Sequence, residues 1–299
     1  MLLALLAPSC SWSFPKQRRL PLTTTTRIEV AALLLSSLRG GDDSDPLLGG
    51  DASCTFPHGQ PPYLAVITEP NACESEEALQ RTVDALSRAV SCSSTDNNGV
   101  DLISLRHSVP TNPAERRGVA NRLVRLAQEL VDLSCRFPFR VVISSDWIDI
   151  VPRVPGLHGI HVKESHRDQI PAFRQAFGAL LLIGTSAHSV ASAVDAWQRY
   201  QPDYFFVGTC YITQTHPEKS VQDLEGPALP GQVVAALQEM IGSDTKNRPP
   251  VLAIGGINGQ NCQEPVRVFG ADGAATIRAV LQAPDPALEV QKMKQNMKQ

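Results

Sequence analysis

Cationic, hydroxyl and small residues, with one aspartate and one isoleucine among them, recur in the segments that follow the short apolar runs of this sequence. They are Arg106, Ser108, Ser145, Asp146, Lys163, Ser186, Thr213, Thr215, His216, Lys219, Gly255, Gly256, Ile277 and Arg278. Hydroxyls, cations and exposed backbone N–H groups are the partners that the oxygens of a phosphate ester require. The pattern therefore predicts a site for a small molecule that carries phosphate.

Eight short apolar runs, which predict strands, alternate with segments of helical periodicity from residue 62 onward. The runs span residues 63–68, 101–106, 140–144, 157–162, 180–183, 204–207, 251–254 and 273–276. Helices are predicted over residues 75–90, 112–133, 189–200, 232–242 and 261–269. Residues 208–227 are typical of a long polar loop, and residues 292–299 of a polar, basic tail.

Continuous apolar strands separated by helices indicate a parallel sheet that is covered on its outer face. Eight such units match the closed (β/α)₈ or TIM barrel, and an open, doubly wound sheet is the alternative. In both folds the active groups lie at the carboxyl ends of the strands. The residues that follow the runs should therefore meet at one mouth.

The stretches AIGGI (253–257) and ADGAAT (271–276) indicate where a phosphate would bind. Adjacent glycines let a phosphate approach the backbone because no Cβ intervenes. A TIM barrel typically builds its phosphate site from the loops after the seventh and eighth strands. Here these loops carry Gly255, Gly256 and the start of a predicted helix at Ile277 and Arg278. A tight turn with a glycine needed only for packing is the alternative.

Composition excludes several other classes. The 299 residues contain 27 Lys and Arg against 30 Asp and Glu, so no basic footprint for nucleic acid exists. No apolar run reaches the 18 or so residues that a membrane span needs. The seven Cys form no CxxC pair, which argues against a zinc ribbon or a disulfide framework. Neither GxGxxG nor a P-loop motif is present.

Residues 1–60 differ in character from the predicted barrel over residues 61–299. A short apolar run at 2–7 precedes a basic, acid-poor and hydroxyl-rich stretch, which is typical of a targeting segment. With Phe14 near the junction, this stretch resembles the two-part plastid presequences of algae. We expect a disordered targeting presequence and linker and a plastid location. A mitochondrial or cytoplasmic location is the alternative, as is a plain disordered tail.

Seven stretches resemble, in order and spacing, the thiamine phosphate synthase family. They are LRHS (105–108), SSDWID (144–149), GIHVKES (159–165), IGTSAHS (183–189), VGTCYITQTHPEKS (207–220), AIGGIN (253–258) and ADGAA (271–275). They equally resemble the non-synthase relative of that family, the thiazole tautomerase. The resemblance covers about residues 62–281. It implies a TIM barrel that joins an aminopyrimidine methyl diphosphate to a thiazole phosphate, with Mg²⁺, and releases diphosphate.

The resemblance also implies roles for single residues. Asp146 falls on a metal-binding Asp of the family, and a hard carboxylate oxygen suits Mg²⁺. Ser186 falls on a contact to the pyrimidine diphosphate. Thr213 and Thr215 fall on the TxT loop, and Gly256 falls on the glycine that touches the thiazole phosphate.

Arg106 falls on the basic residue of the strand-two motif. We predict Ser186, His216 and Lys219 as the residues that act in catalysis. Each of these residues also has a purely structural interpretation, such as a strand-end salt bridge for Arg106.

This sequence departs from the family at several of its positions. Ser108 and His216 stand where the family has lysines, and His166 or the neighbouring Ser165 stands where it has a second metal-binding Asp. Further departures are Ser104 for a Gln, Ser145 for an Asn, Arg278 for a Ser, and Thr209 for the His of the tautomerase. Lys163, Lys219 or Arg278 could replace the missing cations from other loops.

The histidines offer two further interpretations. His158 and His161 are three apart on a strand and face opposite sides, so they are not expected to share a metal. His188 and His216 could act as acid–base groups near neutral pH, or they could be structural.

Three functions remain open from the sequence. The first is a synthase of the thiamine pathway with a degenerate diphosphate and metal site. The second is a relative that binds a thiamine-related phosphate without making the C–N bond. The third is another phosphate-ester enzyme on the same barrel. The oligomeric state, including a homo-oligomer, is equally open.

Overall fold

Eight parallel strands close into a barrel in which each strand pairs with its neighbours in sequence and β8 pairs with β1. The strands are β1 (Tyr63–Ile67), β2 (Leu102–Leu105), β3 (Arg140–Ser144), β4 (Gly159–Val162), β5 (Leu182–Ala187), β6 (Tyr204–Val207), β7 (Val251–Ile254) and β8 (Gly273–Thr276). This computed structural model describes residues 56, 60–91, 98–178, 181–215, 217–242 and 248–299. The predicted TIM barrel is confirmed, and the open sheet is excluded.

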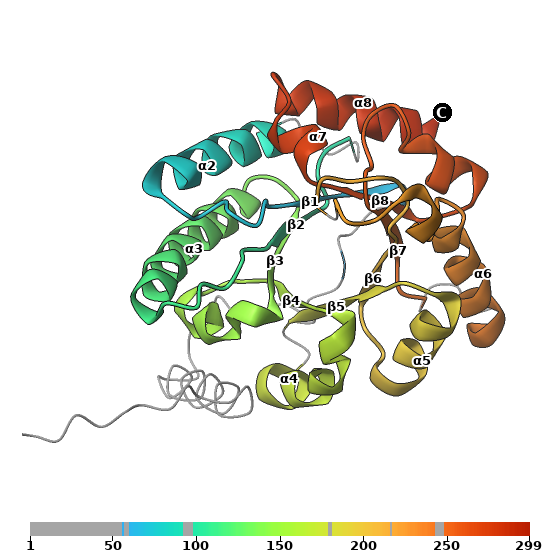
Figure 1. The fold of residues 1–299 in the computed structure, drawn as a ribbon, viewed down its shortest axis with the longest axis horizontal. Coiled ribbons are helices and arrows are strands. Elements are labelled where there is room, and N and C mark those ends of the chain that lie inside the picture. The colour runs from blue at the N-terminus through green and yellow to red at the C-terminus, as the bar shows by residue number, and fades with distance from the viewer. Residues whose placement is uncertain (1–55, 57–59, 92–97, 179–180, 216, 243–247) are drawn as a thin grey trace, which may run out of the picture.

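Helices surround the barrel, as Figure 1 shows with the strands at the centre of the view. They are α2 (Glu76–Ser91), α3 (Pro113–Ser134), α4 (Ile170–Phe177), α5 (Val190–Tyr200), α6 (Leu229–Ile241), α7 (Arg278–Leu281) and α8 (Pro286–Lys298). The short 3₁₀ segments Ser145–Arg153, Glu164–Gln169 and Val221–Asp223 lie in the loops after β3, β4 and β6. No helix in these described ranges is long and apolar enough to cross a membrane.

Helix starts follow the capping residues in the sequence. The Asn112 side chain accepts a hydrogen bond from the Ala114 amide at 2.9 Å, with Pro113 as the first helical residue of α3. The Ser189 side chain accepts one from the Ser192 amide at 3.1 Å and begins α5. Both starts therefore lie where the sequence predicts them.

The C-terminal segment was predicted wrongly. Residues 292–298 are not a polar tail, because they form the second half of α8. Val290, Met293 and Met297 are buried on one face of this helix, at the spacing of an amphipathic helix. Lysines and glutamines between them hide the pattern in the sequence. Lys294 is fully buried as well, because its ammonium group lies 2.7 Å from the Asp101 carboxylate.

Two further boundaries differ from the prediction. β5 spans Leu182–Ala187 and not 180–183, so Ser186 lies within the strand and not after it. The helix predicted over 261–269 is a short π-helical turn at Glu264–Val268. Residues 1–55 and 57–59 lie outside the described part of the chain, so the presequence and the domain boundary at residues 60 and 61 stay predictions.

Candidate active site

A cavity of about 890 Å³ opens at the carboxyl ends of the strands. All eight strands or the loops that follow them contribute to its lining. Its predicted members are Arg106, Lys163, Ser186, Thr213, Thr215, Gly255, Gly256, Ile277 and Arg278. The structure thus brings most of the predicted phosphate site into one hollow.

Other predicted residues lie elsewhere. Ser108 lines a separate hollow of about 430 Å³ together with Glu69 and His107. Ser145 is buried, and its hydroxyl has no hydrogen-bond partner among the described residues. His216 lies outside the described residues. Neither Ser108 nor Ser145 is placed to contact a ligand in the cavity.

The glycine pair after β7 is required by packing. Gly255 and Gly256 have φ values of 101° and 66°, in the left-handed region that favours glycine. A Cβ on Gly256 would lie 2.5 Å from the Ile212 carbonyl oxygen, and a Cβ on Gly255 would lie 2.5 Å from Cγ2 of Thr209. The two glycines therefore let the loops after β6 and β7 pack together. This accounts for them structurally without excluding a phosphate on the cavity side.

Three cations line the cavity in different electrostatic settings. Lys163 Nζ lies 2.6 Å from Asp146 Oδ2, and Arg278 Nε lies 3.4 Å from Glu69 Oε1. The Arg106 guanidinium has no carboxylate within ion-pair distance among the described residues. Burial lowers the pKa of Arg106, and the nearby Arg278 charge adds to this, whereas Asp146 opposes it. Arg106 is therefore the cation of this cavity that is most in need of an anionic partner.

Lys219 lies beside the cavity and is held by Glu225, which the sequence did not single out. Lys219 Nζ donates to Glu225 Oε1 at 2.8 Å, and the Thr209 amide donates to Glu225 Oε2 at 2.6 Å. Burial opposes ionisation of Glu225, yet these two hydrogen bonds keep the pKa of its carboxyl below its usual range. Glu225 thus binds Thr209 and Lys219, which lie on either side of Thr213 and Thr215 in the loop after β6.

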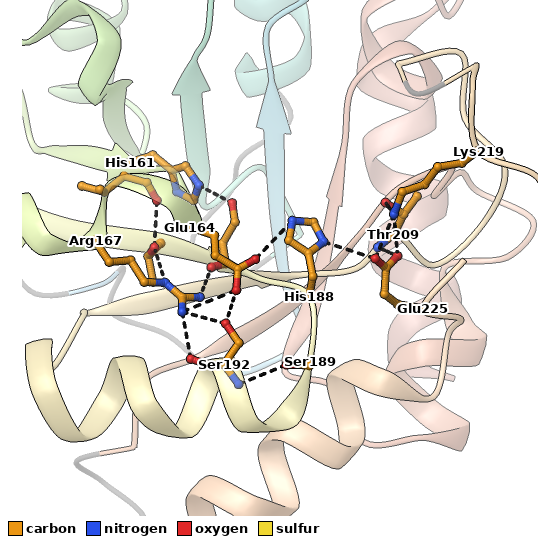
Figure 2. A network of polar contacts seen from close by, with 12 residues as sticks. His161, Glu164, Arg167, His188, Ser189, Ser192, Thr209, Lys219 and Glu225 are labelled. Atoms are coloured by element: carbon orange, nitrogen blue, oxygen red, sulfur yellow. Dashed lines mark hydrogen bonds and ion pairs between the residues drawn. The ribbon is translucent and has the colours of Figure 1, made fainter. Parts of the chain in front are cut away.

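His188 connects this loop to the loop after β4, as Figure 2 shows. Its Nδ1 lies 3.5 Å from Glu225 and its Nε2 lies 3.7 Å from Glu164. The buried Arg167 in turn lies 3.6 Å from Glu164 and donates to the Ser186 carbonyl oxygen. A chain of polar contacts therefore runs around the rim from the loop after β4 to the loop after β6.

His161 was not predicted as a site residue, yet it lines the cavity. Its ring lies between the Tyr204 hydroxyl, 3.1 Å from Nδ1, and the Ser186 hydroxyl, 2.9 Å from Nε2. His158 directly precedes β4 and is not among the residues that line the cavity. His158 Nδ1 accepts a hydrogen bond from the Val141 amide at 3.0 Å. The only sequence signal for His161 was its inward-facing position on a strand.

Asp146 is the carboxylate that the family resemblance assigns to a magnesium ion, although Glu164 and not Asp146 is among the residues that line the cavity. No group of three or more His, Cys, Asp or Glu within the described ranges is placed to hold a metal. Asp146 is 18% exposed and is already paired with Lys163. A single carboxylate fits Mg²⁺ only where substrate phosphate oxygens and water complete the coordination. The described residues by themselves therefore do not form a complete metal site.

Comparison with known proteins agrees with this geometry. A family model described as thiamine monophosphate synthase matches residues 64–280. Thiamine-phosphate synthase of Haloquadratum walsbyi is 28% identical over 222 residues, which cover 74% of this chain and 86% of that protein. Thiamine-phosphate synthase of Methanospirillum hungatei is 31% identical over 193 residues, which cover 64% of this chain and 81% of that protein.

Solved structures share the fold. A thiamine phosphate pyrophosphorylase from Pyrococcus furiosus superposes with a TM-score of 0.57 at 21% identity, and covers 79% of this chain and 95% of its own. At that identity the likeness concerns the fold alone. The family match extends over most of the barrel, and the cavity lies where the family resemblance placed it. On these grounds the chain belongs to the thiamine monophosphate synthase family, and its function is thiamine phosphate synthase-like.

Proposed function

We propose that this protein joins an aminopyrimidine methyl diphosphate to a thiazole phosphate and releases diphosphate. One observation carries the proposal: Arg106, Ser186, Thr215 and Gly256 line the same cavity although they come from four different strand ends. The reaction breaks the C–O bond to diphosphate and forms a C–N bond to the thiazole ring. A cavity of about 890 Å³ is large enough for two small phosphorylated rings.

The leaving diphosphate would lie on the side of Arg106, Lys163 and Ser186. Charge develops on the diphosphate as the C–O bond breaks, and preorganised cations and hydroxyl donors stabilise it. Arg106 supports this placement because it lacks an ion-pair partner among the described residues. The thiazole phosphate would lie across the cavity, at Gly256 and the Thr213–Thr215 loop.

Magnesium belongs to this proposal as an ion that enters with the diphosphate. Asp146 would hold it together with diphosphate oxygens, and the ion would neutralise charge on the leaving group. Lys163 would then release Asp146 and turn to the diphosphate. A plastid location for the protein likewise remains a proposal, since it depends on residues outside the described part of the chain.

Two specific observations favour a second function. Asp146 is neutralised by Lys163 at 2.6 Å, and Ser108 lies outside the cavity. A relative that binds the phosphates without forming the C–N bond would also have these features. The two functions differ in whether product forms.

The test uses the purified full chain with both substrates and Mg²⁺. A synthase releases diphosphate and thiamine phosphate in equal amounts, measurable by phosphorus NMR and chromatography. Binding of both halves in calorimetry without product would favour the binding relative and overturn the synthase. Complementation of a strain that lacks the synthase gives the same answer in cells, because growth without thiamine requires the product.

A further inference from the structure

Three side chains from adjacent strands form a hydrogen-bonded row inside the barrel. Tyr204 comes from β6, Ser186 from β5 and His161 from β4. The Tyr204 hydroxyl lies 3.1 Å from His161 Nδ1, and His161 Nε2 lies 2.9 Å from the Ser186 hydroxyl. Gly184 makes the row fit, because a Cβ there would lie 1.9 Å from the Tyr204 ring. The row ends at Ser186, which lines the cavity.

His161 is the neutral middle of this row. Its ring stacks on Phe206 with 4.6 Å between centroids and lies 5.7 Å from the Tyr204 ring. Burial, helped by the positive charge of Arg106, lowers the pKa of His161 to about 3. A neutral imidazole has one N–H donor and one acceptor nitrogen. The two hydrogen bonds of His161 must therefore run in the same direction along the row.

Tyr204 sets that direction. Its side chain is fully buried, and within the described residues His161 Nδ1 is the hydrogen-bond partner of its hydroxyl. A buried hydroxyl that only accepted would leave its hydrogen without an acceptor, which is costly. Tyr204 therefore donates to Nδ1, and Nε2–H of His161 donates to the Ser186 oxygen.

This direction of the hydrogen bonds leaves the hydroxyl hydrogen of Ser186 without an acceptor in the row. Because the Ser186 oxygen accepts from His161, its own O–H is free to donate into the cavity. The Ser186 backbone is fixed as well, since Arg167 donates to its carbonyl oxygen. We infer that Tyr204 and His161 are positioning residues, which orient the Ser186 hydroxyl as a donor to an anionic oxygen of a bound diphosphate. The assignment of the ligand rests on the proposed function.

The tautomer of His161 tests the row without any substrate. Nitrogen-15 NMR of histidine-labelled full chain, with His161 assigned by H161N, should show a protonated Nε2 and a bare Nδ1. This signal should not titrate between pH 5 and 8. In Y204F the donor to Nδ1 is lost, and the signal should shift toward the Nδ1–H tautomer. A protonated Nδ1 in the wild type, or titration near pH 6.5, would overturn the inference.

Affinity for inorganic diphosphate tests the positioning role. Y204F should weaken calorimetric binding of diphosphate about tenfold, comparable to the loss of one hydrogen bond to a charged group. In an S186A background the same change should have no further effect, because the hydroxyl that it orients is gone. The matched control Y200F, on the outer helix α5, should bind as the wild type does. Equal losses with and without Ser186 would contradict the role even if the tautomer is as inferred.

These outcomes separate the inference from the proposed function. Suppose that His161 is the Nε2–H tautomer and that diphosphate binding depends on Tyr204, but that no thiamine phosphate forms. The positioning role of Tyr204 and His161 would then hold, and the proposed synthase function would be wrong. If the protein is an active synthase and Y204F changes neither the tautomer nor diphosphate binding, the proposed function would hold and the positioning role would be wrong. Melting temperatures of each variant confirm that the compared proteins are folded.

Discussion

The ammonium group of Lys163, which lines the cavity, lies 2.6 Å from the carboxylate of Asp146, which is not among the lining residues. Lys163 is about half exposed, with 53% of its side chain accessible, whereas Asp146 is 18% exposed. A lysine in this setting can exchange its partner at little cost, because exposed ion pairs contribute about 1 kcal/mol or less. Lys163 is thus available to a bound anion.

Replacement of Lys163 tests this availability. K163M should raise KM for the diphosphate substrate about tenfold or more, as expected for the loss of a charged contact. K163R should restore most of the affinity. The matched control K292M removes a similarly exposed, paired lysine on α8 and should leave the kinetics unchanged. An unchanged KM in K163M would remove Lys163 from the diphosphate site.

Glu225 should matter through the loop that it anchors. In E225Q the side chain can still accept from the Thr209 amide, but the charge that holds Lys219 at 2.8 Å is gone. We expect about a tenfold loss in kcat/KM with the thiazole phosphate varied, and a change in unfolding free energy of about 1 kcal/mol or less. Steady-state kinetics and urea denaturation measure the two effects. The exposed Asp195 pairs with Arg199, and D195N should change neither quantity.

Lys294 should be essential for stability. Its ammonium group is fully buried, donates to the Pro62 carbonyl oxygen at 2.8 Å and pairs with Asp101 at 2.7 Å. K294M leaves the Asp101 charge buried without its partner, which should lower the free energy of unfolding by about 3–5 kcal/mol. The double variant D101N/K294M should recover part of the loss in urea denaturation. If K294M is as stable as the surface variant K298M, α8 is not part of the core.

Stability should fall with acidification because of His158. Burial lowers the pKa of His158 to about 4, and Arg140 adds to the effect, while the unfolded chain has the usual value near 6.5. Between these values the unfolded state binds the proton first, so stability is full above pH 6.5 and is lost as pH falls toward 4. His158 should contribute about 1.4 kcal/mol per pH unit to this slope, and the buried His161, with its pKa lowered to about 3, adds to it. Urea denaturation at pH 7, 6 and 5 measures it.

The variant H158Q isolates this term from the other titrating groups. Glutamine can accept the Val141 amide hydrogen bond but does not ionise in this range. The stability difference between wild type and H158Q should therefore shrink by the same amount per pH unit on acidification. A difference that is constant from pH 7 to pH 5 would show that His158 is protonated equally in both states.

The barrel itself could be predicted from the sequence because its signals are local. Apolar runs such as those at β3 and β6 are short, continuous and flanked by helices, and burial on both faces requires this pattern. Caps such as Asn112 and Ser189 mark helix starts in the sequence for the same local reason. The helix α8 could not be predicted, because Lys294 is stable in the core only through Asp101, which lies far away in the chain.

For the candidate site, too, some features could be predicted from local sequence and others could not. The sequence by itself determined that Arg106, Ser186, Thr215 and Gly256 follow or end apolar strands, and parallel closure then requires that such positions share one mouth. The pairs around these residues emerge from the folded chain alone: Lys163 with Asp146, Glu225 with Lys219, and Tyr204 with His161. The Lys163–Asp146 and Tyr204–His161 contacts join different strands and loops, so their geometry depends on the closed barrel, whereas Glu225 and Lys219 lie in one loop that must fold back on itself. No local spacing in the chain encodes such pairs.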